Sequence, residues 1–568
     1  MKVTVSKSKN TTIFYLTKSV WVDGRSTSKT VEKIGSLEEV REKAGGMDPY
    51  EWCKQYAARR TLEEKQEQLE HVIRLSASKR IPAAEQVRFN AGYLFLQDIY
   101  YELGLDRICK EIAGQNSFSY DLNAILSRLI YTRILYPSSK RASLELSRRF
   151  LETPDFELHD VYRALEVLAA SGDFIQSQVY RNSQKILPRR DKILYYDCTN
   201  YYFEIEEEDS FRRYGVSKEH RPNPIVQMGL FMDADGIPLA FSIFPGNENE
   251  QPSLKPLEEQ LLKDFGLEKF IVCTDAGLAS MANRRFNNIR NRAFVTTQSI
   301  KTLKQHLQDY CLSPDGWHLP GDKRTYSLTE LDAGEYRDAI FYKDRWINEN
   351  DMEQHLVVSF SFKHREYQRS VRNRQIIRAA EAVASPSKTK PKQNDYKRFI
   401  HDEHCTNDGE VAGRTIRSLD QDRIEEEEKY DGFYAVCTNL EDSPEEIIAL
   451  NHRRWKIEEC FRIMKTEFKA RPVFLSREDR IRAHFLTCYL ALVIFRLLEK
   501  KTDGRFTCDE LIRTMQNMDL CLFPGEGYVP AYTPDDVSDA LHKAFGFYTD
   551  YQIIPQKTMK KILTKTKK

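Results

Sequence analysis

Residues 451–465, with the sequence Asn-His-Arg-Arg-Trp-Lys-Ile-Glu-Glu-Cys-Phe-Arg-Ile-Met-Lys, place one acid between two cations at helical spacing. At about 100° per residue, Arg454, Glu458 and Lys465 fall within one narrow sector of a helix, and Asn451 falls beside them. An apolar stripe lies next to this sector and would anchor the helix. One helix could therefore offer a carboxylate to a metal ion and cations to phosphates.

The same spacing has a purely structural alternative. Arg454 and Glu458 are four residues apart, and such pairs commonly stabilise helices by a few tenths of a kcal/mol. The segment alone does not decide between the two interpretations. Two aspartates upstream favour the chemical one.

The first aspartate, Asp197, lies in residues 192–203, which are rich in aromatic and β-branched side chains and predict a strand. Residues 225–232 and 237–244 predict two further strands, joined by the tight turn Asp235-Gly236. We therefore expect Asp197 on the first of three antiparallel strands.

The second aspartate, Asp275, ends a short apolar strand and precedes a glycine turn and a predicted helix at 280–289. Ligands bind at this edge of open α/β sheets. A further helix and a further strand are predicted nearby, at 251–265 and 293–297. The order of three antiparallel strands, helix, strand, helix and strand predicts a ribonuclease-H-like core, in which Asp197 and Asp275 meet in space.

Each aspartate also has a structural alternative. Asp275 could cap a helix or form a turn, and Asp197 could be a solvent-facing strand residue. Their joint occurrence at the useful edge of one predicted sheet favours chemistry. Asp233 and Asp235 are assigned none, because acids at a hairpin tip are usually turn formers.

Two aspartates and a glutamate form a coherent set of metal ligands. Mg²⁺ takes hard oxygen ligands and keeps water and phosphate oxygens in its shell, and two such ions can activate the attacking oxygen and stabilise the leaving one in phosphodiester chemistry. We predict that Asp197, Asp275 and Glu458 bind metal and are catalytic. Arg454 would bind the DNA backbone as a bidentate fork and Lys465 as a point charge.

These residues resemble the DDE transposases of bacterial insertion sequences, in the branch whose glutamate helix has a Tyr-x2-Arg-x3-Glu-x6-Lys signature. Arg454, Glu458 and Lys465 match three of its four positions, and Asn451 stands where that branch has tyrosine. Asparagine can still hydrogen-bond a phosphate. The resemblance covers roughly residues 190–500. It also implies that Trp455 stacks on a base flipped out near the cleaved DNA end; the alternative is a tryptophan packed at the edge of the apolar stripe.

The resemblance implies a transposase that cleaves phosphodiesters at the ends of an insertion sequence and joins the 3′-hydroxyl ends to target DNA. The expected cofactors are two Mg²⁺ ions, for which Mn²⁺ can substitute. The expected partners are double-stranded DNA, as element ends with terminal inverted repeats and as target, and a second copy of the chain on paired ends. Two alternatives stay open: a ribonuclease-H-fold nuclease without strand transfer, and a catalytically silent DNA-binding derivative of a transposase.

The predicted fold class is α/β, with six regions along the chain. The interval between Asp275 and Glu458 is too long for a loop, and its predicted strands indicate an insertion that is mainly β, a trait of the family it resembles. The regions are a small β-containing unit at 1–60, a helical, candidate DNA-end-binding region at 61–188, a ribonuclease-H-like core at 189–300 and 441–505, the mainly β insertion domain at 301–440, and a C-terminal region with a basic tail at 506–568.

The insertion also contains a basic stretch. Residues 364–383 predict a helix with five arginines, followed by the basic segment 385–392. These suit a phosphate track, although a charge run is often only a solvated face. His401, His404 and Cys405 have no second ligand pair at zinc-site spacing, so we interpret them as ordinary loop residues.

Composition is ordinary for a soluble protein: 41% hydrophobic, 30% charged and a net charge of +1 over 568 residues. Any basic DNA-binding surface must therefore be local. The eleven cysteines include no Cys-x-x-Cys pair, which fits reduced thiols. No secretory segment is expected at the start, and the apolar run 485–498 is too short to span a bilayer. We expect a cytoplasmic bacterial protein that associates with the nucleoid when bound to DNA.

Overall fold

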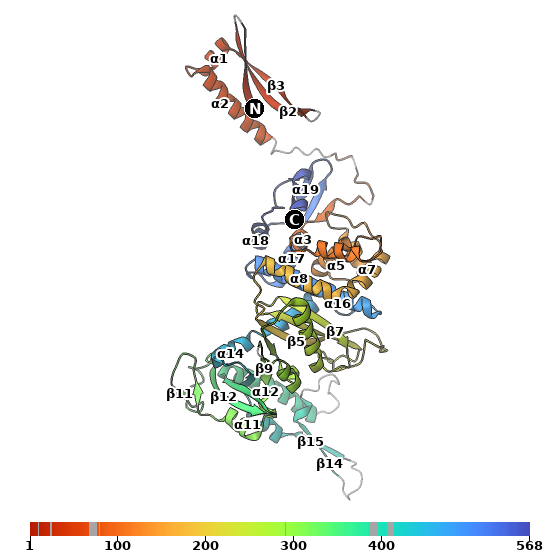
Figure 1. The fold of residues 1–568 in the computed structure, drawn as a ribbon, viewed down its shortest axis with the longest axis vertical. Coiled ribbons are helices and arrows are strands. Elements are labelled where there is room, and N and C mark those ends of the chain that lie inside the picture. Colours follow the sequence, from red (N-terminus) through yellow and green to blue (C-terminus); the bar gives the residue numbers. More distant parts are fainter. Residues whose placement is uncertain are drawn as a thin grey trace. The chain divides into compact units, whose positions relative to one another are not determined.

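The structure is a computed structural model that describes residues 1–8, 11–22, 25–67, 76–78, 80–83, 85–289, 291–384, 396–405 and 414–568 (Figure 1). The chain divides into two compact units. The first comprises Met1–Val87, Cys521–Val529 and Tyr551–Met559, and the second comprises Arg88–Leu520, Pro530–Asp550 and Lys560–Lys568.

The first unit begins with a three-stranded antiparallel sheet followed by two helices. Its elements are β1 (Lys2–Lys7), β2 (Thr12–Val22), β3 (Arg25–Ser36), α1 (Leu37–Ala44) and α2 (Pro49–Glu67). Ser36 and Glu39 form a capping box that starts α1. This unit matches the small β-containing unit predicted at 1–60, and residues 23 and 24 lie outside the described residues. Phe14, Leu16 and Cys53 are among the side chains of the small core.

Six helices come first in the second unit, after the short strand β4 (Arg88–Asn90). Side-chain caps start two of them, since Asp121 accepts the Ala124 N–H and Ser139 accepts the Ala142 N–H. The long helix α16 (Glu478–Lys501) packs against this group. The six helices are α3 (Tyr93–Glu102), α4 (Leu105–Gly114), α5 (Leu122–Leu135), α6 (Lys140–Ser147), α7 (Leu158–Ala170) and α8 (Gly172–Ile186).

The predicted ribonuclease-H-like order is present. It consists of β5 (Ile193–Tyr202), β6 (Ile225–Asp233), β7 (Pro238–Pro245), η1 (Gln251–Ser253), α9 (Leu254–Gln260), η2 (Leu261–Phe265), β8 (Phe270–Thr274), η3 (Ala276–Leu278), α10 (Met281–Phe286) and β9 (Arg292–Gln298). The strand order is β9-β8-β5-β6-β7, with β5–β8 and β8–β9 parallel and the β5-β6-β7 pairs antiparallel. Helices α8 and α9 pack on one face of this sheet through a core that includes Tyr180, Leu254 and Leu257.

The sheet continues beyond β9 through the predicted insertion. β16 (Phe433–Thr438) pairs with β9, and the ten-stranded sheet runs on through β13 (Met352–Phe360), β12 (Phe341–Glu349), β10 (Trp317–His318) and β11 (Thr325–Tyr326). β12 and β13 pair along their full lengths, from Phe341 opposite Phe360 to Glu349 opposite Met352. These five insertion strands thus extend the ribonuclease-H-like sheet, with β16 hydrogen-bonded directly to β9.

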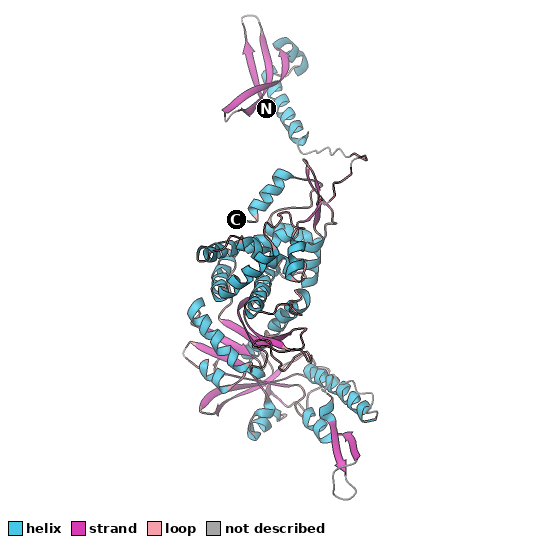
Figure 2. Cartoon of the chain, turned by 90° about the vertical axis from the view of Figure 1, so that its right-hand side faces the viewer, coloured by secondary structure: helices cyan, strands magenta, loops and turns pink. Residues whose placement is uncertain are grey.

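Helices and a small hairpin complete the insertion. They are η4 (Ile300–Thr302), α11 (Gln305–Leu312), α12 (Phe362–Ala384), η6 (Lys397–Phe399), β14 (Ile400–Cys405), β15 (Arg414–Leu419) and α13 (Gln421–Glu428). The helix predicted at 364–383 corresponds to α12. The antiparallel pair β14–β15 stands apart from the large sheet (Figure 2). His401, His404 and Cys405 lie in β14, so their assignment to a loop was wrong.

The segment 451–465 is not one continuous α-helix, contrary to the prediction. α14 (Pro444–His452) ends before a turn at Arg453 and Arg454, α15 (Trp455–Arg462) follows, and η7 (Ile463–Glu467) is a turn of π-helix. The turn and the wider π-helical turn break the count of 100° per residue. The apolar stripe is nevertheless buried: Ile457, Phe461, Met464 and Phe468.

The rest of the chain follows η7. α16 alone among the described helices is long and apolar enough to cross a membrane, and 94% of its most apolar stretch is buried inside the protein, as in a core helix. The remaining elements are α17 (Cys508–Asn517), β17 (Asp519–Phe523), β18 (Gly527–Pro530), α18 (Asp536–Phe545), β19 (Ile554–Pro555) and α19 (Gln556–Lys565). The predicted basic tail is largely the helix α19.

Candidate active site

Asp197 lies on the face of β5 that meets the glutamate segment. Alternate strand residues share a face. On this face the Tyr195 hydroxyl donates to the Leu450 carbonyl of α14 at 2.8 Å, and the Tyr201 hydroxyl contacts Met464 of η7 at 3.7 Å. Asp197 lies between these two tyrosines in the strand, so the fold directs its carboxylate toward the elements that follow residue 443.

Asp275 follows β8 at the level of Asp197. β5 and β8 are parallel, and Tyr195 pairs with Cys273, so each aspartate stands two residues beyond the same paired position. The Asp275 carboxylate accepts the Leu278 N–H at 3.1 Å and caps η3. Asp275 therefore does act as a helix cap, as its structural alternative expected, but only one of its two carboxylate oxygens is used for this. The structure brings the two aspartates together.

The charge on Asp197 is poorly compensated. The side chain is half-buried and accepts one backbone N–H, that of Cys198, at 2.7 Å. Desolvation, with a smaller contribution from the neighbouring Asp275 carboxylate, raises the pKa of Asp197 to about 6 against the opposing effect of Lys218 and Arg454. A carboxylate in such a position is suited to receive a cation.

Arg454 connects the aspartates with Glu458. Its guanidinium is largely buried, donates to Thr297 Oγ1 of β9 at 3.0 Å, and approaches Glu458 Oε1 at 3.9 Å. The same guanidinium lowers the pKa of Asp197. Glu458 itself has 67% of its side chain exposed. The arginine therefore stands between the aspartate pair and the glutamate.

The three predicted metal ligands do not form one compact group. Within the part of the chain that the structure describes, no cluster of three or more His, Cys, Asp or Glu side chains is arranged to hold a metal ion. The pair Asp197 and Asp275 fits a divalent cation in ligand type, charge and desolvation. Glu458 would have to turn away from Arg454 to join them. The donor set therefore fits a metal at the aspartate pair, and its third member is not in place.

Lys465 lies on the other side of Asp197 along β5. Its Nζ donates to Thr199 Oγ1 at 2.7 Å and pairs with Glu219 Oε1 at 3.3 Å. Burial, with a smaller contribution from Lys218, lowers the pKa of Lys465 to about 8 against the opposing effect of Asp197. Lys465 thus lies close to the aspartate pair although the π-helical turn shifts its position on the helix.

Asn451 and Trp455 differ sharply in exposure. Asn451 is buried and donates through Nδ2 to the Tyr434 hydroxyl at 3.1 Å, so it holds α14 against β16. Trp455 is 51% exposed, so part of the ring packs at the edge of the apolar stripe and the rest is open to a ligand. An exposed indole can stack on a base, whereas the Asn451 side chain is already engaged within the protein.

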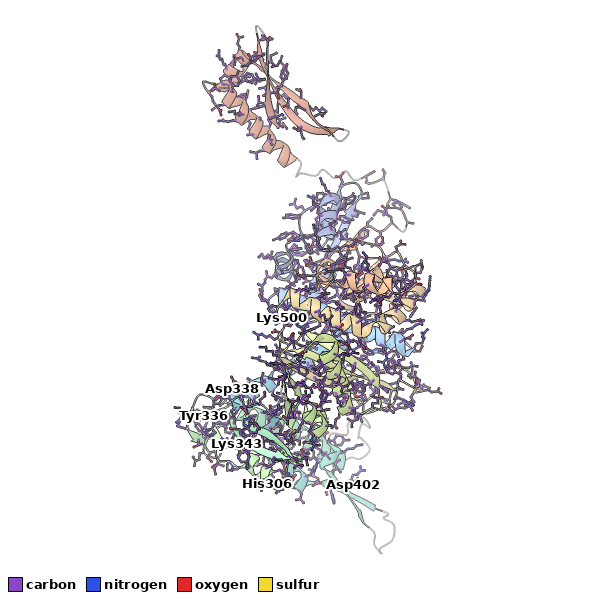
Figure 3. The ribbon with its side chains drawn as sticks, viewed as in Figure 1. His306, Tyr336, Asp338, Lys343, Asp402 and Lys500 are labelled. Carbon is purple, nitrogen blue, oxygen red and sulfur yellow. The ribbon has the colours of Figure 1, made fainter. Side chains whose placement is uncertain are left out.

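A groove runs beside Trp455 and Glu458. It has a volume of about 1000 Å³ and is also lined by residues of β13, β16 and α12 of the insertion. Asp338, labelled in Figure 3, also lines it. The lining residues from α12 include Lys363, His364 and Tyr367; sequence analysis predicted this helix as a candidate phosphate track but did not predict the groove.

The arginines of α12 are only partly available to DNA. Arg372 binds Asp431 through two bonds of 2.5 and 2.6 Å, and Arg369 pairs with Glu428 at 3.5 Å. These arginines fix the helix to the end of the insertion sheet. The basic segment 385–392 lies outside the described residues, as do the side chains of His404 and Cys405.

Lys218 is a further residue of the site that sequence analysis missed. Its Nζ donates to the Cys198 carbonyl at 2.6 Å, pairs with Glu250 at 3.0 Å, and lowers the pKa of Asp197. It lies in the polar segment between β5 and β6. The run Ser-Lys-Glu-His-Arg at 217–221 was the available signal.

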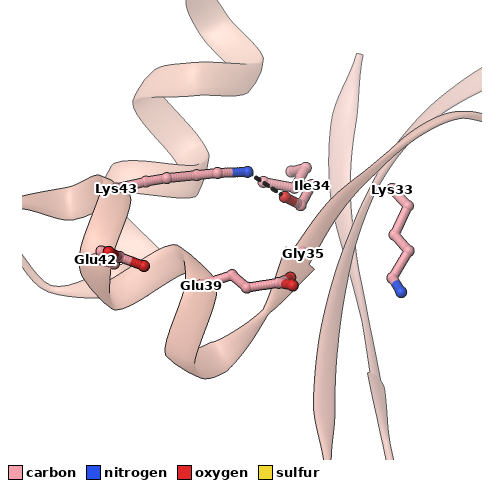
Figure 4. A pocket seen from close by; sticks show the side chains of 6 residues that line it. All are labelled: Lys33, Ile34, Gly35, Glu39, Glu42 and Lys43. Atoms are coloured by element: carbon pink, nitrogen blue, oxygen red, sulfur yellow. Dashed lines mark hydrogen bonds between the residues drawn. The ribbon is translucent and has the colours of Figure 1, made fainter.

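Another pocket lies in the small N-terminal unit and has no catalytic arrangement. It measures about 510 Å³ and is lined by Lys33, Ile34, Gly35, Glu39, Glu42 and Lys43 (Figure 4). Lys43 donates to the Ile34 carbonyl at 2.9 Å, and Glu39 is engaged in the cap of α1. Lys43 and Glu39 thus help to hold α1 against the end of β3.

Comparison with known proteins adds three findings. No curated protein matches the chain. Among solved structures, one similar chain is that in the cryo-EM structure of the piggyBac transposase synaptic complex with hairpin DNA, with 9% sequence identity, a TM-score of 0.36 and coverage of 84% of both chains. Residues 203–494 match the family model described as "Transposase DDE domain". This match contains Asp275, Arg454, Glu458 and Lys465 but starts after Asp197. Because it spans more than half of the sequence, the chain belongs to the transposase DDE domain family.

Proposed function

We propose that this protein is a DNA transposase that cleaves phosphodiesters at the ends of an insertion sequence and joins the 3′-hydroxyl ends to target DNA. Family membership supports phosphodiester cleavage and transfer in general. The specific proposal rests on one observation. Asp197 and Asp275 lie close together at one edge of the sheet, and Arg454 lies between Asp197 and Glu458.

In this proposal Asp197 and Asp275 hold a divalent cation. DDE transposases use divalent metals. When bound, such a cation supplies positive charge to the oxygens of the reacting phosphodiester. Glu458 completes the ligand set by turning toward the aspartates. This turn costs little, because Glu458 is exposed and its contact with Arg454 is long, at 3.9 Å, and ion pairs with an exposed partner contribute at most about 1 kcal/mol.

The cationic residues position DNA. Arg454 lies deep enough to hold a phosphate next to the aspartates, and Lys465 offers a second cation on the same strand face. Trp455 stacks on a base in the groove beside Glu458, and Asn451 supports α14 from behind. Element ends bearing inverted repeats, target DNA, a homodimer on paired ends and a cytoplasmic, nucleoid-associated location belong to the same proposal.

The test compares cleavage and joining by matched variants. The purified protein is incubated with Mg²⁺ and labelled DNA that carries the sequences flanking its gene, together with an unlabelled target. The wild type should cleave and join, Glu458→Ala should bind without cutting, and the control Asp235→Asn should behave as the wild type because Asp235 is a hairpin-turn residue paired with Lys500.

The alternatives give different products. Cleavage without any joined product would indicate a nuclease of the same fold. Binding by all variants with no cleavage by any of them, with Mg²⁺ or Mn²⁺, would indicate a catalytically silent DNA-binding derivative.

A further inference from the structure

Residues 216–221, here named the strap, lie along β5 just beyond Asp197. Three contacts tie the strap to alternate residues of the strand. They are Lys218 Nζ to the Cys198 carbonyl at 2.6 Å, Asn200 Nδ2 to the Val216 carbonyl at 3.1 Å, and the Arg221 guanidinium over the Tyr202 ring at 4.2 Å. The strap therefore lies along the C-terminal half of β5, and its Glu219 reaches Lys465, whose other hydrogen-bond partner is Thr199 of the same strand.

The strap is folded into a tight turn that presents Glu219. The Ser217 hydroxyl accepts the N–H groups of Glu219 and Arg221 at 3.3 and 3.2 Å. His220 has φ 54°, in the left-handed region that non-glycine residues seldom occupy. Ser217 stabilises the turn through these hydrogen bonds, and the turn directs Glu219 toward Lys465 of η7.

Glu219 is shared by two cations from the segment after Glu458. Oε1 lies 3.3 Å from Lys465 Nζ, and Oε2 forms an ion pair with Arg471. All three side chains are largely buried, with 14% of Lys465, 23% of Arg471 and 23% of Glu219 exposed. A carboxylate bound through both oxygens by a lysine and an arginine has the charge and the two-oxygen geometry of a backbone phosphodiester.

We propose that Lys465 and Arg471 form a binding site for one phosphodiester of the DNA backbone beside Asp197, and that Glu219 occupies this site until DNA replaces it. The inference rests on the proposed function and extends it: Arg471 is an additional positioning residue, and Glu219 is an internal competitor of the phosphate. The exchange conserves charge, since one negative group replaces another. The strap must move away from Lys465 as DNA enters.

Binding measurements without divalent metal test the proposal apart from catalysis. Fluorescence anisotropy of a labelled duplex carrying the flanking sequence, titrated with protein in EDTA at several salt concentrations, gives both Kd and its salt dependence. Glu219→Gln should tighten binding about three- to tenfold, because DNA no longer has to displace a charged competitor. The salt slope should stay unchanged, because the same phosphate contacts form.

Arg471→Gln should have the opposite signature. It should weaken binding and reduce the slope of log Kobs against log salt by about 0.9, the value for one lost phosphate contact. Arg471→Lys, which keeps the charge, should retain most of the slope and guards against a variant that fails to fold. In the double variant Glu219→Gln/Arg471→Gln, the gain from Glu219→Gln should shrink.

Glu208→Gln is the matched control. Like Glu219→Gln, it removes one negative charge from the segment that connects β5 with β6. Glu208 pairs with Arg213 at 3.1 Å, away from Lys465 and Arg471, so the substitution should leave DNA binding unchanged. The competitor role is overturned if Glu219→Gln fails to tighten binding, or if Glu208→Gln tightens it equally. The phosphate site is overturned if Arg471→Gln retains the wild-type salt slope.

The two proposals can fail separately. A wild type that binds DNA with the expected variant pattern but never cuts refutes the transposase function and leaves the phosphate site standing. A wild type that cuts and joins while Arg471→Gln keeps its full salt slope refutes only the phosphate site.

Discussion

Two aspartates of the same sheet, the fully buried Asp233 and the half-buried Asp197, show how differently a fold can compensate the charge of an acid. Asp233 is fully buried, receives Arg189 Nε at 2.5 Å, and accepts the N–H groups of Asp235 and Ile237 at 2.9 and 3.0 Å. Asp197 accepts one backbone N–H, and desolvation raises its pKa to about 6. A carboxylate with every oxygen engaged supports structure, whereas a carboxylate left short of partners is free to bind a ligand.

The largest expected effect is the loss of DNA cleavage when Asp197, the acid with few partners, is replaced. Asp197→Asn should lower the rate of DNA cleavage by about 10³-fold or more, because the aspartate pair loses the charge that holds a cation. Its free energy of unfolding should be equal to or higher than that of the wild type, because burial disfavours the ionised carboxylate. Single-turnover cleavage and urea unfolding measure the two effects. Cleavage within tenfold of the wild type would remove Asp197 from the catalytic set.

Replacement of Asp233, whose charge is fully compensated, should lower stability. Asp233→Ala should lower the free energy of unfolding by about 3–5 kcal/mol, because Arg189 is left buried without its partner. Urea unfolding checks this, with Asp235→Ala as control, since its pair with Lys500 is partly exposed and should contribute less than about 1 kcal/mol. A loss equal to that of the control would show that the buried pair contributes little to stability.

Lys140 tests whether a buried charge without partners always belongs to a functional site. It is 5% exposed in α6, its Nζ has no hydrogen-bond partner among the described residues, and desolvation lowers its pKa to about 7. Lys140→Met should raise the free energy of unfolding by a few kcal/mol at neutral pH, on the order expected for removing a desolvated charge, and leave cleavage unchanged.

The sign of the pH dependence follows from the lowered pKa of Lys140. Below pH 7 the lysine is protonated in both folded and unfolded states, and the cost of burying the charge is complete. Between pH 7 and about 10.5 only the unfolded state keeps the proton, so the wild type gains stability as pH rises. The advantage of Lys140→Met should therefore shrink over this range. An advantage that is constant with pH would contradict a buried charge at Lys140.

The smallest expected effect concerns Trp455. Trp455→Ala should weaken binding of a DNA end by about 1–3 kcal/mol, the contribution of one stacked base, and change stability by less than about 0.5 kcal/mol because the ring is half exposed. Trp346→Ala is the matched control, since Trp346 is 43% exposed and stacks on His355 within the protein. Equal losses for both tryptophans would argue against a specific role for Trp455.

Much of the core could be predicted from sequence because its signals are local. The strand containing Asp197, the hairpin with its Asp235-Gly236 turn, and the strand ending at Asp275 all follow from residue patterns a few positions long. The turn-forming role of Asp233 was predicted correctly for the same reason, although its buried partner Arg189 was not. The metal-binding and DNA-binding roles of the site residues remain predictions.

The glutamate segment was harder because its geometry depends on packing. The turn at Arg453 and Arg454 and the π-helix at 463–467 shift side chains relative to an ideal helix, and no residue pattern in the segment indicates either. Asn451 consequently faces Tyr434 within the protein. The insertion was predicted to be mainly β, but the pairing of β16 with β9, which joins it to the core sheet, involves residues more than a hundred positions apart.

The sequence by itself determined the types of residues at the site and the order of strands and helices that bring two aspartates to one sheet edge, because these depend on local periodicity and turn chemistry. Only the tertiary structure decided that Glu458 stands apart from the aspartates, that Trp455 is exposed, and that Glu219 pairs with Lys465 and Arg471. The physical reason is that desolvation and ion pairing act between residues distant in the chain, and no local pattern specifies which of them meet.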